Sequence, residues 1–204
     1  MLEDSVETPE PIRSFLAIDL SPAVRERIGG IQEKLKTILK GVRWVRPEGI
    51  HLTVKFFGDI YERDFPSIDG AVRRKAADAT PMRFRAGGLG AFPRPDRARV
   101  LWVGLEGDLE DLGRLKREVE DALEGAGFPR ERRAFKPHLT LGRARGDRIS
   151  GVEEALRKGD RYEAGTFEAS SLFLFRSELA PGGAVYTKMA EFPFRGSSRR
   201  GTEL

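Results

Sequence analysis

The chain of 204 residues holds two histidines, and the same tetrapeptide contains both of them. One copy reads His-Leu-Thr-Val from His51 to Val54, and the other reads His-Leu-Thr-Leu from His138 to Leu141. Average residue usage would give a second histidine this continuation about one time in a thousand by chance. Histidine is the side chain that gains or loses a proton near neutral pH. The repeat therefore predicts a paired general acid and general base around one substrate.

Both tetrapeptides have the composition of β-strands, in which successive side chains point to opposite faces. His51 and Thr53 then share one face, as do His138 and Thr140, while the aliphatic residues between and after them can enter a core. An imidazole and a hydroxyl roughly 6–7 Å apart can reach different atoms of one phosphate. This arrangement suits in-line phosphodiester cleavage: one imidazole takes a proton from water, the other protonates the leaving oxygen, and the threonines hold non-bridging oxygens. It requires no metal, cofactor or covalent intermediate.

Other readings of these motifs are weaker. A lone histidine on a half-buried strand is usually structural, but two matching copies favour function. A zinc site would need a third ligand, whereas the chain has no cysteine and neither motif contains a carboxylate, so we expect no metal. The glycine-rich run from Gly87 to Gly90 lacks the lysine of a phosphate-binding loop, and we expect it to be a bend at a strand end.

The periodicity of the chain predicts an α+β fold built from a duplicated unit. Strands are expected at 13–20, 42–45, 51–57, 83–90, 99–105, 137–143, 167–176 and 185–192, and helices at 22–40, 65–79, 108–123 and 150–158. The two histidines lie 87 positions apart (138 minus 51), each after a strand and a long amphipathic helix. We therefore expect two pseudo-symmetric lobes, each a mainly antiparallel sheet with helices on its outer face, and an active cleft between them.

The composition limits the class of protein. Apolar residues make up 39% and charged residues 33%, and no run of about eighteen apolar residues exists, so we expect a soluble chain with no membrane span. The absence of cysteine fits a cytoplasmic location. The formal net charge of +4 favours a polyanionic partner. Residues 12–195 should form one bilobal domain, with flexible tails at 1–11 and 196–204.

Beyond the histidine motifs, several blocks resemble the RNA 2′,3′-cyclic phosphodiesterase family, historically called 2′-5′ RNA ligase, within the two-histidine phosphoesterase superfamily. The resemblance extends from Ile12 to Phe194, and its pieces are Arg13–Ile18, Trp44–Glu48 leading into His51–Gly58, Gly90–Pro93, Val100–Gly104, Lys136–Arg143, Leu172–Ser177 and Pro181–Tyr186.

This resemblance implies a metal-independent hydrolase that opens a 2′,3′-cyclic phosphate at an RNA 3′ end and leaves a 2′-phosphate, with 2′-5′ ligation as the same chemistry reversed. By similarity His51 is the proton donor, His138 the proton acceptor, and Thr53 and Thr140 orient the phosphate. The expected partner is an RNA with a cyclic phosphate terminus, tRNA fragments among them, or a cyclic nucleotide, and the protein is expected to act as a monomer. The alternatives are a non-catalytic RNA-end or nucleotide-binding module, or a phosphodiesterase for a small cyclic phosphate or a 2′-5′ oligonucleotide.

Further residues are candidates for substrate binding. Lys136 lies two residues before His138 and should share its face, whereas alternation places Arg143 on the opposite face unless the strand ends first. Phe15, Trp44 and Phe56 could stack a base, although alternation with Thr53 favours a place in the core for Phe56. The arginines within 94–99 and 130–133 are candidate contacts to an RNA backbone.

Overall fold

The computed structural model describes residues 10–157, 162–181 and 183–197, so most of both expected tails and Lys158, the expected end of a helix, lie outside the described residues. Over the described residues the elements follow in the order β1 (Ile12–Ile18), α1 (Pro22–Lys36), β2 (Val42–Trp44), η1 (Pro47–Gly49), β3 (Leu52–Ile60), η2 (Glu62–Asp64), α2 (Phe65–Asp78), β4 (Met82–Phe92), η3 (Pro95–Arg97), β5 (Val100–Gly107), α3 (Leu109–Gly125), β6 (Leu139–Ala144), α4 (Val152–Arg157), β7 (Glu163–Ala169), β8 (Ser171–Ala180) and β9 (Gly183–Pro193).

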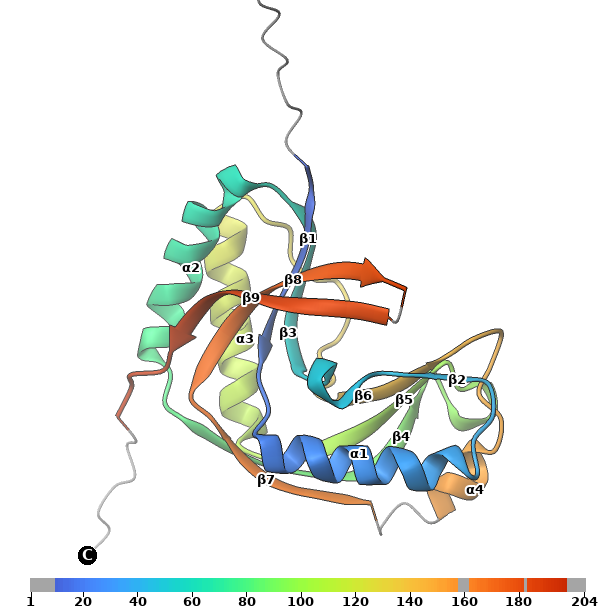
Figure 1. Cartoon of the computed structure of the whole chain (residues 1–204). Coiled ribbons are helices and arrows are strands. Elements are labelled where there is room, and N and C mark those ends of the chain that lie inside the picture. The colour runs from blue at the N-terminus through green and yellow to red at the C-terminus, as the bar shows by residue number, and fades with distance from the viewer. Residues whose placement is uncertain (1–9, 158–161, 182, 198–204) are drawn as a thin grey trace, which may run out of the picture.

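The strands form one curled antiparallel sheet whose order is symmetric about its centre. The order is β7-β4-β5-β6-β3-β1-β8-β9, with β2 added beside β6. The two strands that follow the histidines, β3 and β6, lie side by side at the centre of the sheet. The antiparallel pair of Leu52 with Leu139 joins the two halves there. The predicted α+β fold with two pseudo-symmetric lobes is confirmed, and the lobes are two halves of a continuous sheet (Figure 1).

The helices cover the outer faces of the sheet, and the first helix of each repeat crosses to the other half. Although α1 follows β1 in the chain, it contacts β7 on the opposite half, and α3 packs against α2 and β3 of the first repeat. Figure 1 shows α1 running beneath β4 and β5, while α2 and α3 lie side by side on the other flank. This exchange ties the two repeats together, and one buried hydrophobic cluster extends through both of them.

The first helix begins as predicted and ends earlier. The Ser21 hydroxyl accepts a hydrogen bond from the backbone of Val24 at 3.4 Å, and Pro22 occupies the first turn, where its missing N–H has no cost. The helix was expected to continue to Lys40, but it stops at Lys36 because Lys40 forms a β-bridge with Ser150. The carboxylate of Asp108 lies at the start of α3 as expected, yet it accepts a hydrogen bond from the backbone N–H of Arg83 at 2.8 Å instead of capping the helix.

Two other expectations are wrong. The strand expected at 167–176 is two strands, because the chain turns at Ser170 and passes from the edge of one half, in β7, to β8 in the other half. The run from Gly87 to Gly90 lies inside β4 and not at a strand end. There Gly88 forms a β-bulge with a positive φ of 69°, and Gly90 faces the indole of Trp102 so closely that a Cβ would lie 2.1 Å from the ring.

Candidate active site

The two histidine motifs meet at the junction of the sheet halves. Because Leu52 opposes Leu139 in an antiparallel pair, the register places His51 opposite Thr140 and Thr53 opposite His138. Leu52 and Leu139 are fully buried, so the four polar side chains occupy the other face. Directly opposed residues in such a pair have Cα atoms about 4.5–5.5 Å apart. The sequence prediction that two imidazoles and two hydroxyls converge on one place is therefore consistent with the register.

Each imidazole is held by the same backbone contact. The Nδ1 of His51 lies 2.9 Å from the carbonyl oxygen of Gly49, and the Nδ1 of His138 lies 2.6 Å from that of Lys136. A carbonyl can only accept, so Nδ1 carries the proton in both rings and donates it. In the neutral tautomer this leaves the lone pair on Nε2, at the far side of each ring, available to take a proton from a substrate or water.

A β-bulge follows each threonine at the fourth residue of the tetrapeptide. Thr53 pairs with Ala17 and Lys55 with Leu16, so Val54 is the extra residue. In the second copy Thr140 pairs with Trp102 and Gly142 with Leu101, which leaves Leu141 as the extra residue. An extra residue shifts the alternation of side chains by one place. The residue three positions after each threonine therefore returns to the threonine's face.

Phe56 and Arg143 are the residues that these bulges turn toward the site. Both lie five positions after a histidine, and both line the same cavity as Thr53 and Thr140. The expectation that Phe56 packs in the core is wrong, since 52% of its surface is exposed. The alternation that predicted Arg143 on the opposite face fails because of the bulge at Leu141. Equivalent places in the two repeats thus carry an aromatic ring and a guanidinium.

A cavity of about 490 Å³ contains most of the motif residues. His51, Thr53, Thr140 and Arg143 line it, and His138 borders the junction without being one of its lining residues. Among the described residues no Asp or Glu lines this space, which we call the histidine cavity; its lining is Arg13, Ser14, Phe15, Arg43, Val45, Gly49, His51, Thr53, Phe56, Gly58, Thr140, Arg143, Ser177, Leu179, Ala184 and Tyr186. A site with arginines, hydroxyls and no carboxylate suits an anion.

Aromatic rings fix the two imidazoles. Phe15 stacks on His51 with 4.4 Å between ring centroids, and Tyr186 meets that imidazole edge-on at 5.2 Å. Phe92 meets His138 edge-on at 5.0 Å. Phe15, predicted to stack a base, is only 3% exposed and packs against His51.

The protein environment disfavours the charged form of both histidines. The pKa of His51 is lowered to about 4, chiefly by burial and also by the nearby charges of Arg25 and Arg143, which together outweigh the hydrogen bond to Gly49 and the charge of Asp19. Burial also lowers the pKa of His138, and Arg143 contributes again. Arg143 thus acts on both rings, and both are neutral at pH 7 in the free protein.

The other predicted binding residues lie around the cavity. Lys136 is exposed, with its ammonium 5.8 Å from the centre of the Phe92 ring, and it does not line the histidine cavity; its backbone carbonyl is what holds His138. Trp44 lines a neighbouring cavity and packs partly against the core.

The two predicted RNA-binding arginine clusters do not line the histidine cavity. Arg94 pairs with Asp96 at 2.9 Å, and Arg130 pairs with Asp121 and Glu124. Sequence reasoning missed Arg43 and Tyr186, both of which line the cavity. Alternation in the short strand of Arg43 could have indicated the first, whereas Tyr186 comes from a distant hairpin, and nothing local marks it.

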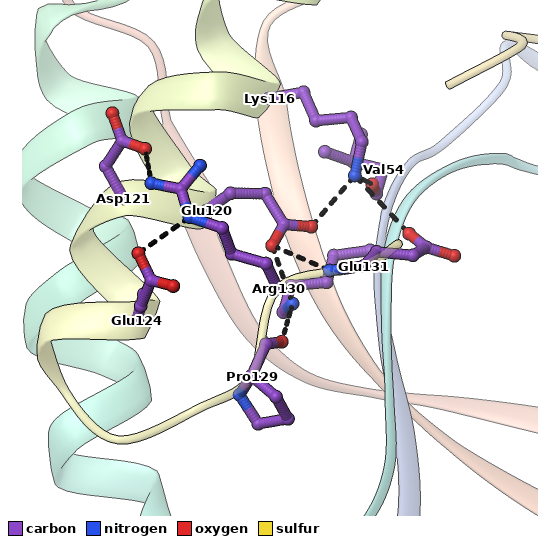
Figure 2. A network of polar contacts seen from close by, with 9 residues as sticks. Val54, Lys116, Glu120, Asp121, Glu124, Pro129, Arg130 and Glu131 are labelled. Carbon is purple, nitrogen blue, oxygen red and sulfur yellow. Dashed lines mark hydrogen bonds and ion pairs between the residues drawn. The ribbon is translucent and has the colours of Figure 1, made fainter. Parts of the chain in front are cut away.

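A buried ion cluster supports the first histidine strand from behind. Lys55, on β3, donates to the carboxylate of Glu120 at 2.9 Å, and Lys116 donates to the same carboxylate at 2.9 Å and to the carbonyl of Val54, the bulge residue, at 3.0 Å. Figure 2 shows Lys116 between Glu120, Glu131 and Val54. The cluster therefore ties α3 of the second repeat to the bulge that turns Phe56 toward the cavity.

The fold and the site define a bilobal phosphoesterase with one histidine motif from each repeat. The model of the family described as LigT like Phosphoesterase matches residues 18–102 and again 103–186, which is one match for each repeat. The chain belongs to this family.

Two relatives and one solved structure illustrate the similarity. A protein of Methanothermobacter thermautotrophicus named RNA 2′,3′-cyclic phosphodiesterase is 37% identical over 182 residues, covering 89% of this chain and 98% of the relative. A protein of Aquifex aeolicus with the same name is 30% identical over 182 residues, covering 89% of this chain and 96% of the relative. The crystal structure of TT0787 of Thermus thermophilus superposes with a TM-score of 0.74 at 28% identity, covering 92% of this chain and all of that one.

Proposed function

We propose that this protein is a metal-independent RNA 2′,3′-cyclic phosphodiesterase that leaves a 2′-phosphate. The observation that carries the proposal is the register of the two tetrapeptides, which puts an imidazole and a hydroxyl from each repeat on one face of the sheet junction. The names of the relatives agree with this activity.

The reaction uses one proton transfer at each end of an in-line displacement. One neutral imidazole takes a proton from water at its Nε2 as the water oxygen bonds to phosphorus. The bond from phosphorus to the 3′ oxygen breaks, and the other imidazole, protonated, gives its proton to that oxygen. Thr53 and Thr140 donate hydrogen bonds to the non-bridging oxygens, and Arg143 stabilises the charge that builds there. In 2′-5′ ligation an RNA 5′ hydroxyl takes the place of water.

Binding of the substrate has to raise the pKa of the acid, so that this imidazole takes up a proton from the solvent. Both histidine pKa values are lowered in the free protein. The negative charge of a bound phosphodiester raises the pKa of a neighbouring imidazole. The acid imidazole is therefore protonated, and the site ready for catalysis, only when the anionic substrate is bound.

The first test is turnover of a 2′,3′-cyclic nucleotide in EDTA, with a product assay that separates 2′- from 3′-phosphate. We expect the 2′-phosphate, and replacing either histidine by alanine should lower kcat at least about a hundredfold. Release of the 3′-phosphate, or turnover that needs added metal, would contradict the proposal. A cyclic phosphate that stays bound and unchanged for hours would identify a binding module instead.

A second test assigns the roles of the histidines. We propose His51 as donor and His138 as acceptor, following the family resemblance. A phosphodiester with a p-nitrophenolate leaving group needs little help from an acid, so His51→Ala should lose much less activity on it than on the cyclic substrate. His138→Ala should lose the same factor on both substrates. The opposite pattern would exchange the two roles.

The proposed partner is RNA with a cyclic phosphate terminus. Among the described residues, none of the helices has the length and apolar character that crossing a bilayer requires. The monomeric state and the cytoplasmic location stay predictions.

A further inference from the structure

The histidine cavity continues into a second cavity of about 510 Å³ that is lined by arginines. The two cavities share residues, Arg43 and Arg143 among them, and Arg46 and Arg145 line the second alone. We call this second space the arginine groove. Like the histidine cavity, it has no Asp or Glu among the described residues that line it.

The four arginines of the groove gather in one place without any carboxylate partner among the described residues. In the part of the chain that the structure describes, none of the four forms an ion pair, whereas Arg73, Arg85 and Arg130 elsewhere on the surface do. Arg145 uses only its Nε, which donates to the carbonyl of Val42 at 3.2 Å, so its terminal nitrogens stay available.

The pairing of β2 with β6 places two of these charges against each other. Arg43 is the direct cross-strand partner of Arg143. Like charges directly opposite on neighbouring strands destabilise a sheet. A carboxylate nearby would relieve this repulsion, and the described lining of both cavities contains none. An anion bound between the two guanidinium groups would relieve the repulsion. An uncompensated pair of like charges is therefore expected at a ligand site and not on a surface selected for stability.

We propose that the arginine groove binds backbone phosphates of the RNA strand that leads to the cyclic end. This inference rests on the proposed function, and it makes an oligonucleotide, and not a cyclic mononucleotide, the substrate class that the site fits. A strand that ends in a 2′,3′-cyclic phosphate continues only from its 5′ oxygen, so a single groove leading away from the histidines accommodates it. Phosphates are recognised by arginine through paired charge-assisted hydrogen bonds.

The test compares kcat/KM for 2′,3′-cyclic AMP and for oligoribonucleotides of two, four and six nucleotides that end in the cyclic phosphate. We expect kcat/KM to rise at least about tenfold from the mononucleotide to the longer substrates, since each added charged hydrogen bond contributes about that factor. Arg46→Gln combined with Arg145→Gln should lower the ratio of hexamer to mononucleotide about tenfold or more. It should also reduce the slope of log kcat/KM against log salt for the hexamer by about 1.4, at about 0.7 for each lost phosphate contact.

Arg74→Gln is the matched control, because Arg74 is an exposed arginine on α2 that lines neither cavity. It should leave the ratio and the salt slope unchanged. Equal kcat/KM for all lengths, or a ratio that the double variant does not change, would overturn the groove proposal while the phosphodiesterase activity stands.

A binding measurement separates the two proposals if no substrate is turned over. Fluorescence anisotropy of the labelled hexamer with the His51→Ala, His138→Ala protein should give tighter binding than with the same protein carrying Arg46→Gln and Arg145→Gln. If that difference appears without any turnover in the wild-type protein, the groove stands and the proposed activity fails. If affinity is equal in the two proteins, the groove proposal fails.

Discussion

Glu120→Gln should be among the most destabilising single substitutions in this chain. The carboxylate of Glu120 accepts from Lys55 and Lys116 and also from the backbone N–H of Glu131 at 3.2 Å. Lys55 is 2% exposed, Lys116 10% and Glu120 7%, so water screens these charges poorly. Removing the central negative charge leaves two buried ammonium groups facing one partly exposed carboxylate, that of Glu131. Breaking a buried pair in this way costs about 3–5 kcal/mol.

Urea unfolding at pH 7 measures this effect. With an m-value of about 2 kcal/mol/M, a loss of about 4 kcal/mol moves the midpoint down by about 2 M. Asp69→Asn is the matched control: it breaks an exposed i,i+4 pair with Arg73, whose side chains are 42% and 51% exposed, and should cost about 0.3–0.5 kcal/mol. A loss below about 1 kcal/mol for Glu120→Gln at unchanged m would refute the reasoning that the cluster is desolvated.

The pH dependence gives the same argument a second test. Burial raises the pKa of Glu120, but hydrogen bonds from Lys116 and Lys55 outweigh it, so the pKa lies below its usual range in the folded protein. A folded-state pKa that is depressed contributes stability above the unfolded pKa of about 4.3, and this contribution disappears as the pH falls through the folded value. The difference between wild type and Glu120→Gln should therefore be constant from pH 8 to 5 and shrink below pH 4. A difference that grew on acidification would have the wrong sign.

Three further outcomes follow from the site. The base must be neutral and the acid protonated, and the pKa values of both imidazoles are lowered, so the two inflections of the kcat/KM profile should lie below pH 6.5. An optimum above pH 7.5 would be inconsistent with these environments. Thr140→Val should lower kcat about a hundredfold with folding unchanged by circular dichroism, since it removes a donor to the reacting phosphate; a wild-type rate would exclude that role. Gly90→Ala should lower the free energy of unfolding in urea by about 1–3 kcal/mol, because its Cβ would overlap the Trp102 ring. Gly30→Ala on α1, where a Cβ meets nothing within 4 Å, should raise the free energy of unfolding by up to about 1 kcal/mol. Equal effects of the two substitutions would show that the close packing is not stabilising.

The sequence allowed prediction of those features that depend on local periodicity. The apolar stripe of α1, buried at Val24, Ile28 and Leu35, and the shared face of each histidine and threonine follow from side-chain spacing alone. Features set by pairing between distant segments did not follow. The bulges at Val54 and Leu141 depend on the register with β1 and β5, so counting alternate residues misplaced both Phe56 and Arg143.

The same limit applies to charge. The arginines within 94–99 and 130–133 resemble the groove arginines in composition, and only the fold decides which of them meet carboxylates and which line a cavity together. Arg130 meets the end of α3, where Asp121 and Glu124 neutralise it (Figure 2). Arg43 meets Arg143. Clustering in the sequence therefore selected arginines that do not line the histidine cavity, whereas cross-strand pairing identifies two that do.

The two bulges also explain how a symmetric scaffold can act on an asymmetric substrate. Phe56 and Arg143 occupy equivalent places, but one offers an exposed ring on the His51 strand and the other a cation on the His138 strand. We propose that a base stacks on Phe56, with its ribose and the 3′ leaving oxygen on the side of His51. The attacking water would then enter in line from the side of His138. This orientation agrees with the proposed role of His51 as the acid. Exchanging the two residues, Phe56→Arg with Arg143→Phe, should therefore impair the cyclic substrate more than a p-nitrophenyl phosphodiester that has no base to orient.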